Sequence, residues 1–175
     1  MKITIFNGSP RKNGNTASVT SSLMREMEGK ASVNEHFLYH LNIKGCLTCG
    51  TGTGKDKAME MIEEIVSSDV VVFASPIYMW KLADSSAALI KLLYSVCRGD
   101  DRIADAVENK RTAVILTTDT DENVASDVLV SLRNMCEDMK MRFVGALTIP
   151  FADTDKITGA ECQNEIKNFA SELVK

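Results

Sequence analysis

The sequence predicts an α/β protein built on a doubly wound, five-stranded parallel sheet. Short β-branched, apolar runs alternate along the chain with segments whose apolar residues recur every three or four positions. Two of the runs, residues 70–74 and 113–117, are apolar almost throughout, as strands covered by helices on both faces are. No repeat or low-complexity linker interrupts this alternation, and 175 residues is a suitable length for one well-packed domain. We therefore expect a single domain over residues 1–175, with right-handed crossovers that place helices on both faces of the sheet.

The five strands are predicted from composition and from the residues that break each run. Residues 2–6 are apolar and β-branched, and a glycine and a proline follow almost at once. Residues 33–41 carry apolar side chains at alternate positions, which is typical of an edge strand, with His36 and His40 on the other face. Because these histidines have no partner motif, we expect them to be exposed or structural. The other strands are residues 70–74, 113–117 and 143–149.

Helices are predicted between these strands from apolar residues at helical spacing. The first begins near Asn15 or Thr16, either of which is a suitable N-cap, directly after the loop that follows the first strand. A second stripe runs over residues 58–66, and a long amphipathic helix is expected over residues 124–139. The remaining helices are residues 87–96 and 166–173.

Composition limits the classes of partner and the compartment. A net charge of −4 without clustered Lys and Arg argues against a surface for nucleic acid or an anionic membrane. No apolar run approaches the length of a membrane span, and the N-terminal apolar stretch is too short for a signal peptide. Five scattered cysteines do not suit a disulfide framework and fit a reducing compartment. We expect a cytoplasmic protein whose partner is a small molecule.

The loop after the first strand, Gly8-Ser-Pro-Arg-Lys-Asn-Gly-Asn-Thr16, has the features of a phosphate site. A helix that starts here presents unpaired N–H groups at the positive end of its dipole. The loop adds neutral donors and two cations, which are Ser9, Asn13, Asn15, Thr16, Arg11 and Lys12. This set suits a phosphate dianion. Taken alone, the same residues also fit an ordinary strand-to-helix turn with a good cap.

A second unusual segment, Ala74-Ser-Pro-Ile-Tyr-Met-Trp80, follows the third strand. Pro76 lacks an N–H and stiffens the turn, while the amides of residues 77–80 remain free to meet a planar ring with acceptors on its edge. Tyr78 and Trp80 offer flat faces for stacking. Taken alone, this segment also fits a loop whose aromatic side chains cover the core.

The expected strand order is 2-1-3-4-5, in which the first and third strands are neighbours. Ligands of such sheets bind at the carboxyl ends of the strands where the order of connection reverses, and flavodoxin with its FMN is the type example of this rule. Both unusual segments follow these two strands. Their coincidence predicts one site that takes a phosphate and a planar ring.

Together the two segments resemble those of the NAD(P)H-dependent FMN reductases and related flavodoxin-fold flavoproteins, including the iron-sulfur flavoprotein branch. The resemblance covers most of the chain, because residues 69–74 and 141–145 also fall where that family has strands. It implies FMN as cofactor and NAD(P)H as electron donor. It further implies that the phosphate and ribityl end of FMN would be held by Ser9, Arg11, Asn13, Asn15 and Thr16. The isoalloxazine would lie along Pro76, Ile77, Tyr78 and Met79, and Thr117 and Thr118 would approach it from the other side.

The chain departs from this family pattern at two places. Relatives often carry Lys-x-Phe-x-Asp-Arg on the helix after the second segment, where this chain has Ala87, Leu89, Lys91 and Leu92. The usual dimer contacts and substrate mouth therefore lack their familiar residues. The loop after Thr118 is acidic over residues 119–122 and lacks the glycines of relatives. A negative cluster beside a flavin disfavours both its anionic reduced form and the phosphate of NADPH.

One close pair of cysteines invites a metal or redox interpretation. Cys46 and Cys49 align with the start of the compact cysteine cluster of the iron-sulfur branch, but Gly52 stands at the third position. Two thiolates cannot hold a four-iron cluster or a structural zinc, so no metal is expected, whereas a redox dithiol remains open. The glycine-rich residues 50–55 are not a Walker A loop, because Cys49 and Asp56 occupy two of its required positions.

The sequence therefore predicts an FMN-dependent oxidoreductase that passes electrons from NAD(P)H to a quinone, free flavin or nitro compound. The cofactor supplies the chemistry, so no side chain is named as catalytic. Two alternatives stay open, a flavodoxin-like electron carrier and a non-catalytic flavin-binding protein. A homodimer is expected because members of the family it resembles usually associate, and because Tyr78, Met79 and Trp80 would expose apolar surface. The wide apolar stripe on the following helix also favours it, namely Leu82, Leu89, Leu92 and Leu93.

Overall fold

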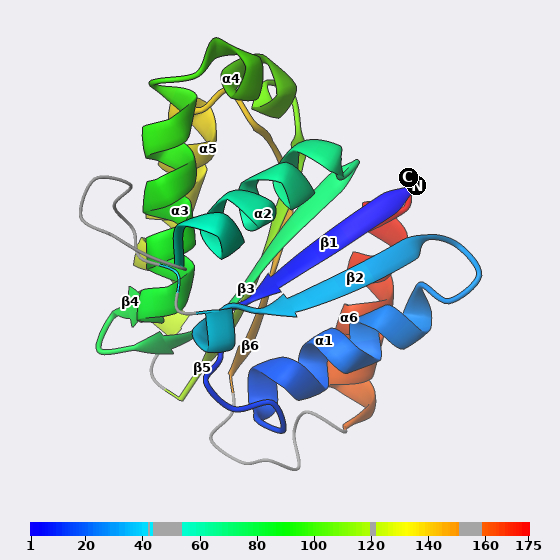
Figure 1. Cartoon of the computed structure of the whole chain (residues 1–175). Coiled ribbons are helices and arrows are strands. Elements are labelled where there is room, and N and C mark those ends of the chain that lie inside the picture. Colours follow the sequence, from blue (N-terminus) through cyan, green and yellow to red (C-terminus); the bar gives the residue numbers. More distant parts are fainter. Residues whose placement is uncertain (42, 44–53, 120–121, 151–158) are drawn as a thin grey trace.

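The structure is a computed structural model that describes residues 1–41, 43, 54–119, 122–150 and 159–175, with backbone only at 54–56 and 122–123. Strands and helices alternate along the chain as expected (Figure 1). The strands are β1 (Lys2–Asn7), β2 (Ser32–Phe37), β3 (Val70–Tyr78), β4 (Lys81–Leu82), β5 (Arg111–Thr118) and β6 (Arg142–Pro150). The helices are α1 (Asn15–Glu26), the 3₁₀ turn η1 (Leu38–Leu41), α2 (Gly54–Ser67), α3 (Asp84–Cys97), α4 (Asp101–Val107), α5 (Glu122–Asp138) and α6 (Ala160–Leu173).

The sheet confirms the predicted class, with one correction to the number of strands. Five parallel strands lie in the order β2-β1-β3-β5-β6, which is 2-1-3-4-5 when they are counted in chain order. A sixth strand, β4, pairs antiparallel with the end of β3. It was missed because β3 runs through the proline at position 76 to Tyr78 and then turns back, so that a hairpin replaces the expected loop.

Two layers of helices cover the sheet, α1 and α6 on one face and α2, α3, α4 and α5 on the other (Figure 1). Successive side chains of a strand point to opposite faces, so β1 and β3 contribute residues to the hydrophobic core on each face of the sheet. Ile3, Ile5 and Val72 pack with α1 and α6. Phe6 and Phe73 pack with the helices of the other face. The two strands are mostly apolar because both of their faces are covered, and the polar residues Thr4, Asn7 and Ser75 are buried with them.

Several expected boundaries were wrong in ways that affect the site. The edge strand β2 ends at Phe37 instead of residue 41, because Leu38 turns fully inward and starts η1. Helix α1 begins at Asn15 with Gly14 as its N-cap, so neither Asn15 nor Thr16 is the cap. Helix α4 was not expected, although Asp100 caps it by accepting from two backbone N–H groups.

The apolar stripe on α3 has a different explanation from the one expected. Leu89, Leu92 and Leu93 are fully buried in the core between α3 and the sheet. Only Leu82, before the helix, is part-exposed. The width of this stripe therefore reflects a deeply buried helix and gives no support to a second packing face.

Candidate functional site

The two unusual segments meet at the carboxyl edge of the sheet. Asn7, the last residue of β1, is paired with Ala74 of β3, and Pro76 is paired with Thr117 of β5. The loop after β1, the β3–β4 hairpin and the end of β5 therefore leave the sheet next to one another (Figure 1). The strand order places this junction at the reversal of connection, where α/β sheets bind ligands.

The loop after β1 is held in place by its own short hydrogen bonds. The Gly8 N–H donates to the carbonyl of Ala74 over 2.8 Å, which ties the loop to β3. The Arg11 N–H donates to Ser9 Oγ and the Gly14 N–H donates to the carbonyl of Arg11, each over 3.2 Å. A Cβ on Gly14 would lie 3.0 Å from the Cβ of Arg11, so the turn is tight enough to favour glycine there. The loop is therefore shaped before any ligand arrives.

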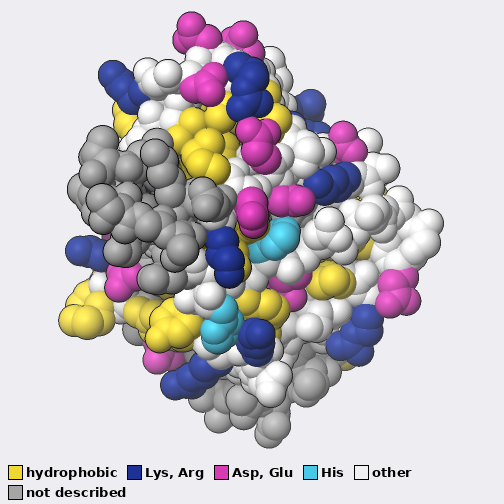
Figure 2. Space-filling model, in the orientation of Figure 1, with side chains coloured by type: hydrophobic (Ala, Val, Ile, Leu, Met, Phe, Trp, Pro, Cys, Tyr) yellow, Lys and Arg dark blue, Asp and Glu magenta, His cyan; other side chains and the backbone are white. Residues whose placement is uncertain are grey.

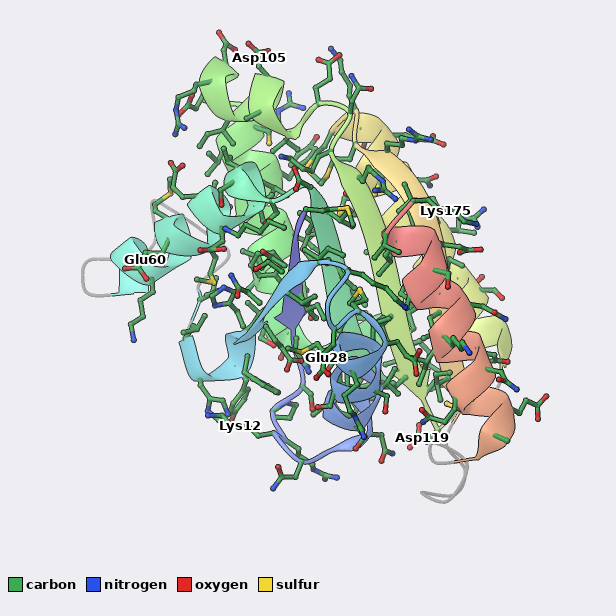
Figure 3. All side chains as sticks on the ribbon, turned by 90° about the vertical axis from the view of Figure 1, so that its right-hand side faces the viewer. Lys12, Glu28, Glu60, Asp105, Asp119 and Lys175 are labelled. Atoms are coloured by element: carbon green, nitrogen blue, oxygen red, sulfur yellow. The ribbon has the colours of Figure 1, made fainter. Side chains whose placement is uncertain are left out.

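The start of α1 leaves backbone donors for a ligand. Its N-cap is Gly14, and no side chain caps the helix. The first N–H groups of a helix have no partner within it, so those of Asn15, Thr16 and Ala17 lie at the positive end of the dipole without an intrahelical acceptor. Arg11 and Lys12 are exposed beside them, and Figure 3 shows Lys12 projecting from this end of the molecule. Free N–H groups beside two cations have the chemistry that an anion requires.

The expected phosphate ligands fall into two groups. Arg11 and Asn13 are exposed, and Asn15 is half-buried. Ser9 and Thr16, by contrast, are buried, and their hydroxyls already have partners. Ser9 Oγ is bonded within the loop, and Thr16 Oγ1 lies 2.6 Å from Thr117 Oγ1. Ser9 and Thr16 therefore help to build the loop, and a direct bond from either side chain to phosphate remains a prediction.

The β3–β4 hairpin presents the second half of the site. Ile77 pairs with Leu82 and Tyr78 with Lys81, which leaves Met79 and Trp80 as a two-residue turn with φ of 47° and 62°. Such a turn normally takes Asn-Gly, because left-handed backbone costs other residues about 1–2 kcal/mol each. Strain of this kind persists where the surrounding structure imposes it, often at ligand sites.

The hairpin is rigid at its base and apolar at its tip. Ser75 Oγ is buried and accepts the Ala83 N–H over 3.0 Å, which closes the base of the hairpin onto α3. Tyr78, Met79 and Trp80 are 49%, 82% and 69% exposed. Figure 2 shows hydrophobic side chains gathered where Figure 1 places this hairpin, at the lower left. The tip thus offers apolar surface of the kind that a planar ring covers.

The start of α3 holds the loop and the hairpin together. Ser85 Oγ donates to the carbonyl of Gly8 over 2.9 Å. A Cβ added at Gly8 would lie 1.9 Å from Ser86 Oγ, so glycine is required for this approach. The loop, the hairpin and α3 therefore form one unit.

A cleft of about 480 Å³ lies between this unit and η1. Tyr39, on η1, faces the hairpin residues Tyr78 and Met79 across it. The full lining is Gly8, Pro10, Tyr39, Tyr78, Met79, Lys81, Leu82, Ala83, Asp84 and Ser85. Flat and apolar side chains dominate one wall, which suits an aromatic ligand.

The remaining predicted residues occupy the floor of the junction. Pro76 and Ile77 are buried within β3, and Thr117 and Thr118 are fully buried at the end of β5. Asp119 is exposed at the same end of the molecule as Lys12 (Figure 3). Of the acidic loop over residues 119–122, residues 120 and 121 lie outside the described residues, and Glu122 is the first residue of α5.

The hydrogen-bond donors, cations and apolar surface at this junction match the two parts of a flavin mononucleotide, its phosphate and its ring. A phosphate requires N–H groups and cations, which the uncapped start of α1 and the exposed Arg11 and Lys12 provide. A flat ring requires apolar walls, which the hairpin provides. The two requirements are met by adjoining segments. The fold and the site therefore define a nucleotide-binding α/β protein of the flavodoxin type.

The comparisons with known proteins name the family. The model of the NADPH-dependent FMN reductase family matches residues 1–154. The chain belongs to that family. The description of the family names an NADPH-dependent reductase of FMN.

A curated relative and several solved structures are similar to the chain. An iron-sulfur flavoprotein of Clostridioides difficile is 38% identical over 88 residues, a match that spans 45% of this chain and only 39% of that protein. A structure of Trp repressor binding protein from Bacillus subtilis has a TM-score of 0.73 at 20% identity and covers 98% of this chain and 99% of that one. The structure of an NADH:FMN oxidoreductase in its apo form has a TM-score of 0.74 at 15% identity and covers 99% of this chain and 88% of that one. These two structural likenesses show the fold.

The cysteines that the structure describes are buried or half-buried thiols. Burial raises the pKa of Cys97 on α3 and of Cys162 on α6, and it raises that of Cys136 on α5 to about 12. These thiols therefore stay protonated at neutral pH, as fillers of the core. Cys46 and Cys49 lie outside the described residues, as do residues 50–53 of the glycine-rich segment. Within the described ranges, no three His, Cys, Asp or Glu side chains gather as a metal site would require.

Some residues of the site were not expected from the sequence. Ser75, Ser85 and Asn7 form hydrogen bonds that shape the loop and the hairpin. Their one sequence signal is position: Asn7 ends the first strand, Ser75 follows the apolar run 70–74, and Ser85 comes shortly after the second unusual segment. The histidines met expectation: His36 is half-buried and stacks on Phe6, and His40 is exposed. Among the described helices, none is long and apolar enough to cross a bilayer.

Proposed function

We propose that this protein passes electrons from NAD(P)H through FMN to a small acceptor, namely a quinone, a free flavin or a nitro compound. The observation that supports this proposal is the junction of an anion-binding loop with an exposed apolar hairpin at the carboxyl edge of β1 and β3. Bound at this junction, FMN would supply the redox chemistry, which is acceptance of a hydride from the nicotinamide donor and delivery of two electrons to the acceptor.

The side chains around the junction bind and orient the cofactor. Arg11, Asn13, Asn15 and the first N–H groups of α1 hold the phosphate, and Ser9 and Thr16 fix the loop from behind. Pro76, Ile77, Tyr78 and Met79 line the ring. Thr117 and Thr118 close the floor on the side of β5.

We further propose a cytoplasmic homodimer in which the neighbouring subunit covers the hairpin. Met79 and Trp80 are adjacent apolar residues and both are exposed, so they form one continuous apolar surface. Covering them would also exclude water from the ring. The partner of the reaction is a small molecule, and neither nucleic acid nor a membrane is part of the proposal.

Cofactor binding is tested by titration of the purified chain with FMN, FAD and ATP. FMN should bind most tightly, and the loaded protein should be yellow. ATP bound more tightly than FMN would overturn the proposal, because it would show that the loop serves a triphosphate.

Turnover is tested by steady-state oxidation of NADH and NADPH by the FMN-loaded protein, with a quinone, riboflavin or a nitroaromatic compound as acceptor. Oxidation that depends on acceptor supports the reductase. Tight FMN binding without nicotinamide oxidation would point to the electron carrier or to a non-catalytic flavin-binding protein.

A further inference from the structure

Asn7 is a fully buried polar residue at the point where β1 becomes the phosphate loop. Both the oxygen and the nitrogen of its side-chain amide form hydrogen bonds. Its Oδ1 accepts the backbone N–H of Ser9 over 2.9 Å, and its Nδ2 donates to Glu35 Oε1 over 2.9 Å. The Ser9 N–H can only donate and a carboxylate accepts, so the orientation of the amide is fixed by its partners. Asn7 therefore connects the first turn of the loop to Glu35.

Glu35 is held by a second donor on the same oxygen. Thr20 Oγ1 lies 2.6 Å from Glu35 Oε1 and 3.1 Å from the carbonyl of Ala17. A hydroxyl has one proton, and the carboxylate is the closer and stronger acceptor. Asn7 Nδ2 also lies 3.5 Å from Thr20 Oγ1. The network formed by Asn7, Glu35 and Thr20 therefore joins three elements, β1, β2 and α1.

The face of the sheet explains why these three side chains meet. Asn7 shares a face of β1 with Ile3 and Ile5, the face that α1 covers. Glu35 is paired with Ile5 across β1 and β2, so it lies on the same face. Thr20 lies on α1 above them and is fully buried. The half-buried carboxylate of Glu35 on the edge strand thus meets Asn7, the last residue before the loop.

We propose that Glu35 is a positioning residue for the cofactor phosphate, acting through Asn7 on the Ser9 N–H. This inference rests on the proposed function. With its own N–H turned inward, Ser9 places its Oγ to accept the Arg11 N–H, and the Gly14 N–H then closes on the carbonyl of Arg11. That turn leads into Gly14, the N-cap of α1, which has no side-chain cap, and it leaves the Arg11 side chain exposed. Without Glu35 the Asn7 amide loses a partner and can rotate, so the loop loses the bond that sets its first turn.

The test compares FMN with riboflavin, which has the same ring and no phosphate. Glu35→Ala should raise the dissociation constant of FMN about tenfold while that of riboflavin stays unchanged. Glu35→Gln should have a smaller effect, because its amide oxygen still accepts. Glu26→Ala is the matched control, since it removes a half-buried carboxylate from α1 and should change neither constant. Equal weakening of FMN and riboflavin by Glu35→Ala would overturn the inference, because it would show a general loss of structure.

A second measurement needs no cofactor. Hydrogen exchange of the Ser9 amide should be slow in the wild-type apo protein and faster in Glu35→Ala, while amides in β5 keep their protection. If Glu35→Ala does not fold, Thr20→Val keeps the shape of its side chain, removes one bond to Glu35 and serves for both measurements. Unchanged Ser9 exchange together with unchanged FMN affinity would overturn the inference. If the wild type binds neither flavin, the proposed function fails, and Ser9 exchange still decides whether Glu35 sets the turn.

Discussion

Single residues at the carboxyl edge divide into those that build the site and those left to meet a ligand. Ser9 and Thr16 have paired hydroxyls and fix the shape of the loop. Arg11 is exposed and has its charge at the positive end of α1. A charged donor gains most from a charged acceptor. Substitution of Arg11 should therefore affect the ligand, whereas substitution of Ser9 should affect the loop.

Arg11→Ala should weaken FMN binding by about 1.5 to 3 kcal/mol, because it removes a charge-assisted bond to the phosphate. The loss should be smaller at high salt, since screening weakens the wild-type interaction. Isothermal titration at two salt concentrations measures both effects. Arg25→Ala, which removes an exposed cation from the last turn of α1, is the control. Unchanged affinity in Arg11→Ala would remove this residue from the site.

Cys136 should be unreactive in the folded protein. Its pKa is raised by burial from 9.0 to about 12, so the folded state keeps its proton while an unfolded thiol loses it near pH 9. The stability that this thiol contributes is therefore complete below pH 9.0 and is lost as the pH rises towards about 12. Iodoacetamide at about pH 8, followed by mass spectrometry, should label Cys136 only in denaturant. Rapid labelling of the native protein would contradict its burial.

At the scale of elements, the site depends on a loop, a hairpin and a helix that are bonded to one another. Gly8 donates to β3 and accepts from Ser85 on α3, so it is held on both sides. The hairpin places two residues in left-handed backbone and exposes both. The strain and the close approach are properties of the assembled elements, and each can be tested by one substitution.

Gly8→Ala should destabilise the protein by about 1–3 kcal/mol, because the new Cβ overlaps Ser86 Oγ. Ser86→Gly should recover much of this loss in the double variant, since it removes the two closest atoms. The free energies of unfolding in urea of the wild type, the two single variants and the double variant complete this double-mutant cycle. Additive effects would show that the two positions do not meet.

Met79→Gly should raise the free energy of unfolding by about 1 kcal/mol, because glycine tolerates positive φ. It should also weaken FMN binding, since it removes apolar surface from the ring wall. Lys140→Gly is the matched control: Lys140 also has positive φ, at 54°, and lies outside the site. It should raise stability with no change in FMN affinity. Equal FMN affinity in both variants would show that Met79 does not contact the flavin ring.

At the scale of the whole molecule, α3 and the hairpin give different evidence about association. The leucines of α3 are fully buried and offer nothing to a partner. Tyr78, Met79 and Trp80 remain exposed as one apolar group at the tip of the hairpin. The hairpin tip is therefore the surface that the proposed dimer would cover.

Sedimentation equilibrium at micromolar concentration should show a dimer with FMN bound. Trp80→Lys should shift it towards the monomer, because a charge would be buried at the interface. Lys91→Ala, an exposed residue of α3 away from the hairpin tip, should leave the mass unchanged. A wild-type species of 19.2 kDa with FMN bound would show that one chain closes its own site.

The sequence by itself determined the class of fold and indicated where the candidate site lies. Apolar runs at residues 70–74 and 113–117 require cover on both faces, and only helices between parallel strands provide it. The phosphate loop could be recognised because glycine, hydroxyl and cation positions lie within nine consecutive residues. Local signals of this kind need no partner from elsewhere in the chain.

Tertiary structure decided what depends on contacts between distant residues. The hairpin forms because Lys81 pairs back onto Tyr78, and Met79 and Trp80 carry no turn signal. The burial of the α3 leucines depends on the sheet beneath them. The network of Asn7, Glu35 and Thr20 joins positions up to 28 residues apart that meet only when β2 and α1 pack beside β1. A residue's own type does not reveal such partners, because they are set by register and packing.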